Sequence, residues 1–96
     1  MQEKIRFQKN VASDLDRILE AYESKSAITA NKVRDELANT LEYISMFPEM
    51  YAVVDDDIRL VKTKNYPLLI QYCIVEGIPV VLSVFVSGLE DKLKRQ

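Results

Sequence analysis

Three basic side chains lie close together in the middle of the chain: Arg59, Lys62 and Lys64. Side chains of this kind hold a phosphate and stabilise the charge that develops during its transfer. The chain has no histidine, so it lacks the usual neutral-pH general base and the commonest metal ligand. On a strand, Arg59 and Lys62 would point to opposite faces and would not form one patch. The cluster is therefore a candidate functional site, and a solvated strand face is the alternative.

No other part of the sequence predicts a cofactor or a metal site. The carboxylates of Asp55–Asp57 are adjacent, but no other ligand lies near them in sequence. We favour a solvated turn that opposes edge-to-edge strand pairing. Gly77 and Gly88 are the only glycines, so there is no glycine-rich phosphate loop. Cys73 has no partner for a disulfide, and we expect it to pack as a small hydrophobe in a reducing compartment.

Aromatic and methionine side chains are more numerous than one core stripe needs, and these residue types are enriched at protein interfaces. A basic segment near the end of the chain suits the rim of such an interface. Core packing and a homodimer are the alternatives. The candidate partner-binding residues are Tyr22, Tyr43, Met46, Met50, Tyr51, Lys92, Lys94 and Arg95.

The elements that must position these residues centre on a hydrophobic hairpin, Tyr66–Val86. Two runs rich in β-branched and aromatic residues flank the short break Glu76-Gly77, which is typical of adjacent antiparallel strands. The second run, Val80–Val86, is apolar on both faces apart from Ser83. Such a strand lies inside a sheet with cover on each side.

The remaining elements follow from hydrophobic spacing. A first strand over Glu3–Phe7 would direct Ile5 and Phe7 to the core. Apolar residues at helical intervals then predict two helices joined by a tight turn. The helices are expected over Lys9–Glu23 and from the Ser26 cap to Phe47-Pro48, a loop over Glu49–Asp57, a strand over Ile58–Lys62, and a docked turn or frayed tail over Leu89–Arg95.

The order β-α-α-β-β-β predicts an α+β fold in which a helical hairpin packs on an antiparallel four-stranded sheet. The 96 residues suit a single domain over residues 1–96. A net charge of −2 argues against a large nucleic-acid surface. No signal peptide or bilayer-spanning run is present, so we expect a soluble, cytoplasmic protein without a membrane partner.

Several phrases, taken in order, resemble one protein family. The chain resembles the RelE/ParE superfamily, the toxin halves of bacterial type II toxin–antitoxin pairs, over nearly its whole length. Each phrase is weak alone, whereas their order and spacing are fairly specific. The phrases are Phe7 followed by Asp14-Leu15 and Ile18, then Phe47-Pro48-Glu49-Met50, Ile58-Arg59-Leu60, and Lys64–Tyr72.

The resemblance implies one of two activities, namely gyrase poisoning in the ParE branch or ribosome-dependent mRNA cleavage in the RelE branch. Lys62 fits one basic position of the cleaving branch, but Leu69 stands where those members carry an arginine. The segment Val86–Asp91 ends in acidic residues that would repel a phosphate. These departures favour the ParE branch.

Our hypothesis is a ParE-like toxin, with roles in growth inhibition and plasmid stabilisation, that binds DNA gyrase and is neutralised by a cognate antitoxin. The first alternative is a ribosome-dependent mRNA interferase, an endoribonuclease acting through Arg59, Lys62 and Lys64. The second is a degenerate, non-toxic member that only binds antitoxin. No cofactor is implied by any of the three.

Overall fold

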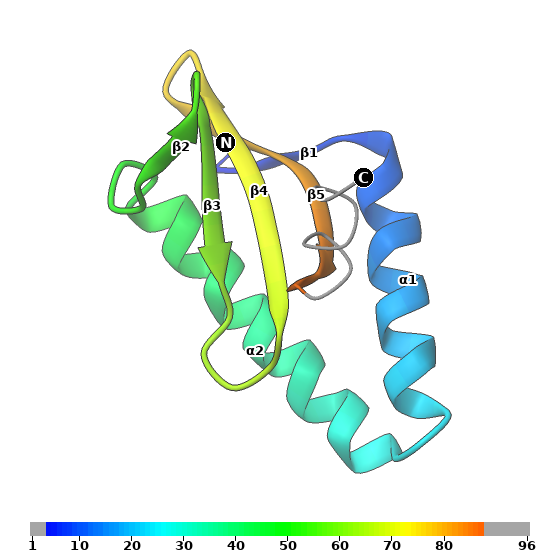
Figure 1. The fold of residues 1–96 in the computed structure, drawn as a ribbon. Helices are drawn as coiled ribbons and strands as arrows, with labels where there is room; N and C mark the ends of the chain where they lie inside the picture. The colour runs from blue at the N-terminus through cyan, green and yellow to red at the C-terminus, as the bar shows by residue number, and fades with distance from the viewer. Residues whose placement is uncertain (1–3, 88–96) are drawn as a thin grey trace.

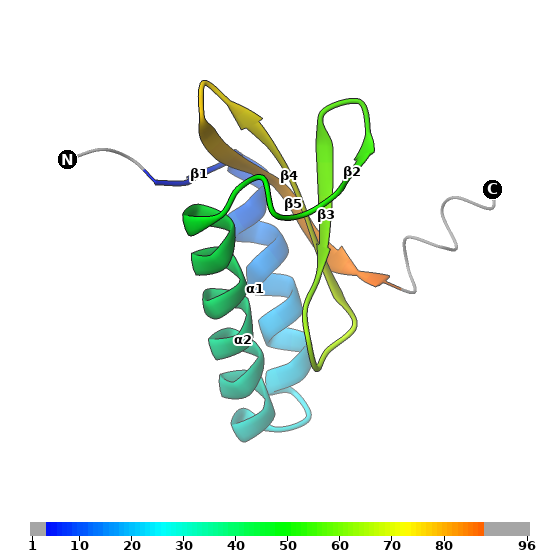
Figure 2. The same cartoon turned by 90° about the vertical axis from the view of Figure 1, so that its left-hand side faces the viewer.

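The computed structural model describes residues 4–87. Its helices form a hairpin that covers one face of a five-stranded sheet (Figure 1, Figure 2). The predicted α+β class is confirmed, and the predicted tail Leu89–Arg95 lies outside the described residues. The elements in chain order are β1 (Arg6–Phe7), α1 (Lys9–Glu23), α2 (Ala27–Met46), β2 (Val53–Asp55), β3 (Ile58–Lys62), β4 (Leu68–Val75) and β5 (Ile78–Val86).

The sheet has one strand more than the sequence predicted. Its order is β1-β5-β4-β3-β2, and the additional strand β2 lies within the segment Glu49–Asp57 that was expected to be a loop. β2 to β5 pair antiparallel in succession, whereas β1 pairs parallel to β5. The expectation of an entirely antiparallel sheet was therefore wrong. One extra strand after the helical hairpin reverses the direction of every later strand, so the last one runs parallel to the first.

The core lies between the helical hairpin and the sheet. The inner stripe of α2 supplies Val33, Leu37 and Ile44, all of which are buried. They pack in one cluster with Ile70 and Tyr72 of β4, and Leu41 is partly buried against the same cluster. The predicted cap of α2 is also confirmed, because the Ser26 hydroxyl accepts a hydrogen bond from the Thr29 N–H at 3.2 Å.

The central hairpin carries a bulge in β5. Gln71 of β4 pairs with Ser83, and the next residue, Tyr72, pairs with Val81, so Leu82 is the extra residue. The bulge leaves Val81 and Val84 both buried in the core cluster, although they are three positions apart. On the other face, the Ser83 hydroxyl donates to the Gln71 side chain at 2.9 Å.

Side chains of α1 satisfy the edge of β5 where β1 ends. The Gln8 N–H donates to the Val81 carbonyl at 3.0 Å, and there the chain turns into α1. Beyond that point the Asn10 amide donates to the Leu82 carbonyl at 2.9 Å. The Val84 N–H donates to a carboxylate oxygen of Asp14 at 3.2 Å. Because Asp14 is buried and Arg17 donates to its other oxygen, this carboxylate ties α1 to the bulge.

The first strand is shorter than the predicted Glu3–Phe7 and directs its residues differently. Ile5 packs partly against the core, as expected. Phe7 is 48% exposed, so the prediction that it faces the core was wrong. The physical reason is the length of β1, because a two-residue strand at the sheet edge turns into α1 before the core can cover its last side chain. Among residues 4–87, no helix has both the length and the apolar character needed to span a bilayer.

We predict that Asp14→Ala lowers the free energy of unfolding by about 1–3 kcal/mol, because it leaves the Val84 N–H without an acceptor. Amide hydrogen exchange should show the largest acceleration at Val84. The control is Asp16→Ala, which removes an exposed carboxylate from the same helix. Equal losses of stability in the two variants would contradict this account.

Candidate functional site

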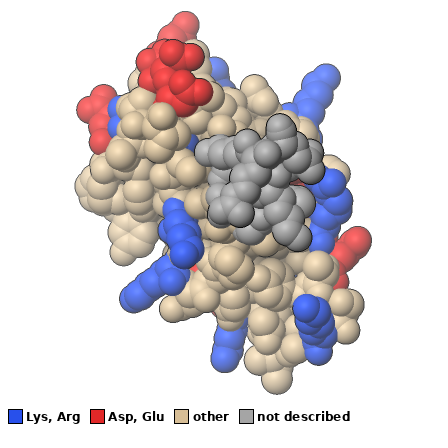
Figure 3. Space-filling view, in the orientation of Figure 1, with Lys and Arg blue, Asp and Glu red and all other residues tan. Residues whose placement is uncertain are grey.

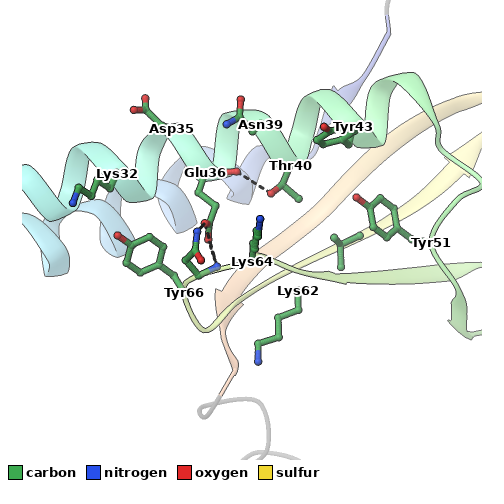
Figure 4. A pocket seen from close by; sticks show the side chains of 12 residues that line it. Lys32, Asp35, Glu36, Asn39, Thr40, Tyr43, Tyr51, Lys62, Lys64 and Tyr66 are labelled. Carbon is green, nitrogen blue, oxygen red and sulfur yellow. Dashed lines mark hydrogen bonds between the residues drawn. The ribbon is translucent and has the colours of Figure 1, made fainter.

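A groove runs between α2 and the turn that joins β3 to β4 (Figure 4). Its volume is about 730 Å³. Residues of one face of α2, from Lys32 to Tyr43, form one wall, and the opposite wall runs from Val61 to Tyr66. Tyr51 closes one end. The groove is therefore lined by aromatic and charged side chains together, which suits a protein segment better than a small apolar ligand.

Glu36 fixes the turn that forms the outer wall of this groove. Its carboxylate accepts from the Asn65 backbone N–H, at 3.0 and 3.1 Å to its two oxygens, and from the Asn65 side-chain amide at 2.7 Å. Within the turn, the Thr63 hydroxyl donates to the Tyr66 carbonyl at 2.7 Å. The position of Lys64 and Tyr66 over the groove thus depends on one carboxylate of α2.

Tyr66 closes the end of the groove near the start of α2. Its ring meets that of Tyr22 edge to face, with centroids 5.7 Å apart. Burial raises the pKa of the Tyr22 hydroxyl above its usual value, and the neighbouring Tyr66 and Glu36 raise it further. The Tyr22 hydroxyl is therefore protonated at neutral pH. This predicted partner-binding residue is half-buried and packs against the core.

The opposite end of the groove is fixed by contacts to the segment after α2. The Tyr72 hydroxyl donates to the Pro48 carbonyl at 2.6 Å, and the Arg59 guanidinium donates to the carbonyls of Glu49 and Tyr51. The Tyr51 ring stands edge to face on Tyr72 with centroids 6.5 Å apart. Burial raises the pKa of both tyrosines, and in Tyr72 the positive charge of Arg59 opposes this rise.

The three candidate phosphate-binding residues do not converge. Arg59 is half-buried, and one nitrogen of its guanidinium, Nη1, donates to two backbone carbonyls. Lys62 and Lys64 both line the groove, but their side chains point in different directions, that of Lys62 away from α2 (Figure 4). Lysine and arginine side chains are spread over the face seen in Figure 3. Among residues 4–87, no three His, Cys, Asp or Glu side chains are grouped to hold a metal ion.

An exposed apolar surface continues from the Tyr51 end of the groove. Sequence analysis identified three of its members, Tyr43, Met46 and Met50, as candidates for partner binding. It missed the other two, because Phe47 was assigned to the helix end and Val53 to a loop. We name this surface the α2–β2 patch, and it consists of Tyr43, Met46, Phe47, Met50 and Val53.

The candidate partner residues therefore fall into three groups. Tyr43 and Tyr51 line the groove, and Tyr43 also belongs to the α2–β2 patch together with Met46 and Met50. Tyr22 does not line the groove but packs edge to face against Tyr66, which does. The basic residues of the tail lie outside the described residues, and their role stays a prediction. These are Lys92, Lys94 and Arg95.

Comparison with known proteins gives likeness in structure alone. No protein-family model matches the chain, and no curated protein is similar to it in sequence. A chain in the solved structure of the chromosomal ParDE TA system from P. aeruginosa superposes with a TM-score of 0.75 at 14% identity, over 85% of this chain and 92% of that one. The isolated E. coli RelE toxin gives a TM-score of 0.47 at 14% identity, over 95% of both chains. The first likeness establishes a shared fold.

We predict that Glu36→Gln loosens the turn over the groove. A glutamine retains only one acceptor oxygen and places an amide donor against the donors of Asn65, so amide exchange at Asn65 should accelerate at least about tenfold. Glu42→Gln is the matched control, since Glu42 is exposed on the same helix. Unchanged exchange at Asn65 would show that the turn holds its position without this carboxylate.

Proposed function

We propose that this protein is the toxin of a type II toxin–antitoxin module, of the RelE/ParE superfamily and nearer its ParE branch. It acts by binding another protein and is neutralised by a cognate antitoxin. The shared fold with a chain of the ParDE system supports this proposal, and so do the sequence phrases that resemble the superfamily. DNA gyrase is the proposed target, because the ParE branch poisons it.

The observation that carries the proposal is the contrast between two surfaces. The α2–β2 patch exposes five apolar or aromatic side chains next to a groove, which is the composition of a protein interface. The residues that a ribonuclease would need are dispersed, since Arg59 binds backbone carbonyls and Lys62 and Lys64 point in different directions. This arrangement favours binding over phosphoryl chemistry.

The antitoxin is the natural occupant of the exposed apolar surface. A toxin that leaves such a patch uncovered is stabilised in the cell by a partner that buries it. An amphipathic helix or a strand would suit a surface that runs from the groove to the edge of the sheet. Lys92, Lys94 and Arg95 are proposed as the rim of the same or a second interface.

Induced expression should arrest growth, and co-expression of the protein encoded by the neighbouring small reading frame should relieve the arrest. The purified protein should inhibit DNA supercoiling by gyrase and leave mRNA intact in a translating extract. A rim charge mainly alters association, so Lys62→Ala should weaken growth inhibition only partly. Loss of a transition-state donor would instead lower a cleavage rate by about 10²–10³.

Lys64→Ala is the matched control, because it removes the same charge from a neighbouring position in the wall of the same groove. Codon-positioned cleavage of mRNA that disappears with Lys62→Ala alone would replace the proposal with the mRNA interferase. Antitoxin binding without any growth arrest would indicate a degenerate member of the superfamily.

A further inference from the structure

The two edges of the sheet are protected to different degrees. Beyond the two residues of β1, the edge of β5 that has no strand partner is satisfied by Asn10 and Asp14 of α1. At the other edge, β2 pairs with β3 on one side only. No described residue within the range 4–87 pairs with its outer side. An uncovered edge strand is a template for another strand, and proteins usually blunt it.

The exposed side chains of β2 are apolar and favour pairing with another strand. Val53 and Val54 are 48% and 57% exposed, although neighbouring residues of a strand point to opposite faces. Val53 pairs with Arg59 and therefore lies on the helix side of the sheet. There it continues the surface formed by Met46, Phe47 and Met50, so an added strand would meet apolar side chains on both of its faces.

The negative charge at the end of β2 favours a basic partner segment over a second copy of the chain. Asp55–Asp57 form the turn at the end of β2, and Asp56 adopts a φ of 48° within it. Within residues 4–87, none of the three carboxylates has an ion-pair partner. Acidic side chains also gather at this end of the molecule in Figure 3. A second copy paired in parallel through β2 would set these aspartates side by side, and an antiparallel copy would press Asp55 against Val53.

We propose that β2 is a docking edge for an extended segment of a partner protein, which adds a sixth strand to the sheet. The segment has apolar residues at alternating positions, which cover Val53 with the α2–β2 patch on one face and Val54 on the other. Lysine or arginine follows at the end that lies beside Asp55–Asp57. The identification of this partner as the antitoxin rests on the proposed function, whereas the edge and its chemistry do not.

The test is selection of a randomised short-peptide library on the full-length chain. Enriched peptides should alternate apolar residues and end in lysine or arginine, and their binding should weaken as salt is raised. Bound peptide should slow amide exchange in β2. Val54→Lys should weaken binding at least about tenfold, since it places a charge on the docking edge.

Two controls keep the result interpretable. Ile28→Lys alters an equally apolar side chain that is 71% exposed at the far end of α2, and it should leave binding unchanged. Both variants replace exposed residues, so each should fold with a stability change within about 0.5 kcal/mol. Replacement of Asp55 and Asp57 by asparagine should weaken the binding of the basic peptides by about two- to fivefold per charge. It should also reduce the salt dependence of that binding.

Acidic enriched peptides, or peptides that bind Val54→Lys as well as the wild type, would overturn the inference. A concentration-dependent dimer that Val54→Lys dissociates would also overturn it, because the occupant would then be a second copy. The two proposals fail separately. An antitoxin that binds Val54→Lys normally contradicts the docking edge alone, whereas the absence of any antitoxin leaves the peptide result standing and contradicts the proposed function.

Discussion

Two polar side chains of α1 bind the backbone of β5 where no strand pairs with it, and the rest of the fold depends on these contacts. β1 pairs for two residues only, so β5 beyond Val81 lacks a strand partner, and the Val84 N–H would otherwise be buried without an acceptor. Asn10 and Asp14 supply the donor and the acceptor that Leu82 and Val84 need. A buried, unpaired amide costs about 1–3 kcal/mol, a large part of the stability of a small domain. This contact fixes α1 on the sheet, and the hairpin then places α2 beside it.

The shape of the candidate site follows from the placement of α2 on the sheet. α2 is held by Val33, Leu37 and Ile44 in the core, and the stripe beside them then forms the groove wall. Glu36 fixes the β3–β4 turn at one end. Arg59 fixes the segment after α2 at the other. At both ends, side chains that bind backbone groups hold the walls of the groove in place.

Sequence patterns predicted what depends on local spacing and missed what depends on pairing. The bounds of α1 and the Ser26 cap of α2 follow from periodicity and capping chemistry, and both were predicted. β2 was missed because Val53-Val54-Asp55 is too short to show alternation and borders an acidic turn. Because β2 was missed, the parallel pairing of β1 with β5 was not predicted either. The role of Arg59 could not be predicted, because its carbonyl partners come together only in the folded chain.

Arg59 connects the candidate phosphate-binding residues with the α2–β2 patch. A guanidinium has donors in one plane, and those that bind the carbonyls of Glu49 and Tyr51 are not available to a phosphate. The same bonds order the segment between α2 and β2, from which Met50 and Val53 project. Both bonds come from one guanidinium nitrogen, Nη1. Their loss would loosen the segment that carries the α2–β2 patch, so the observed contacts of Arg59 hold that patch in place.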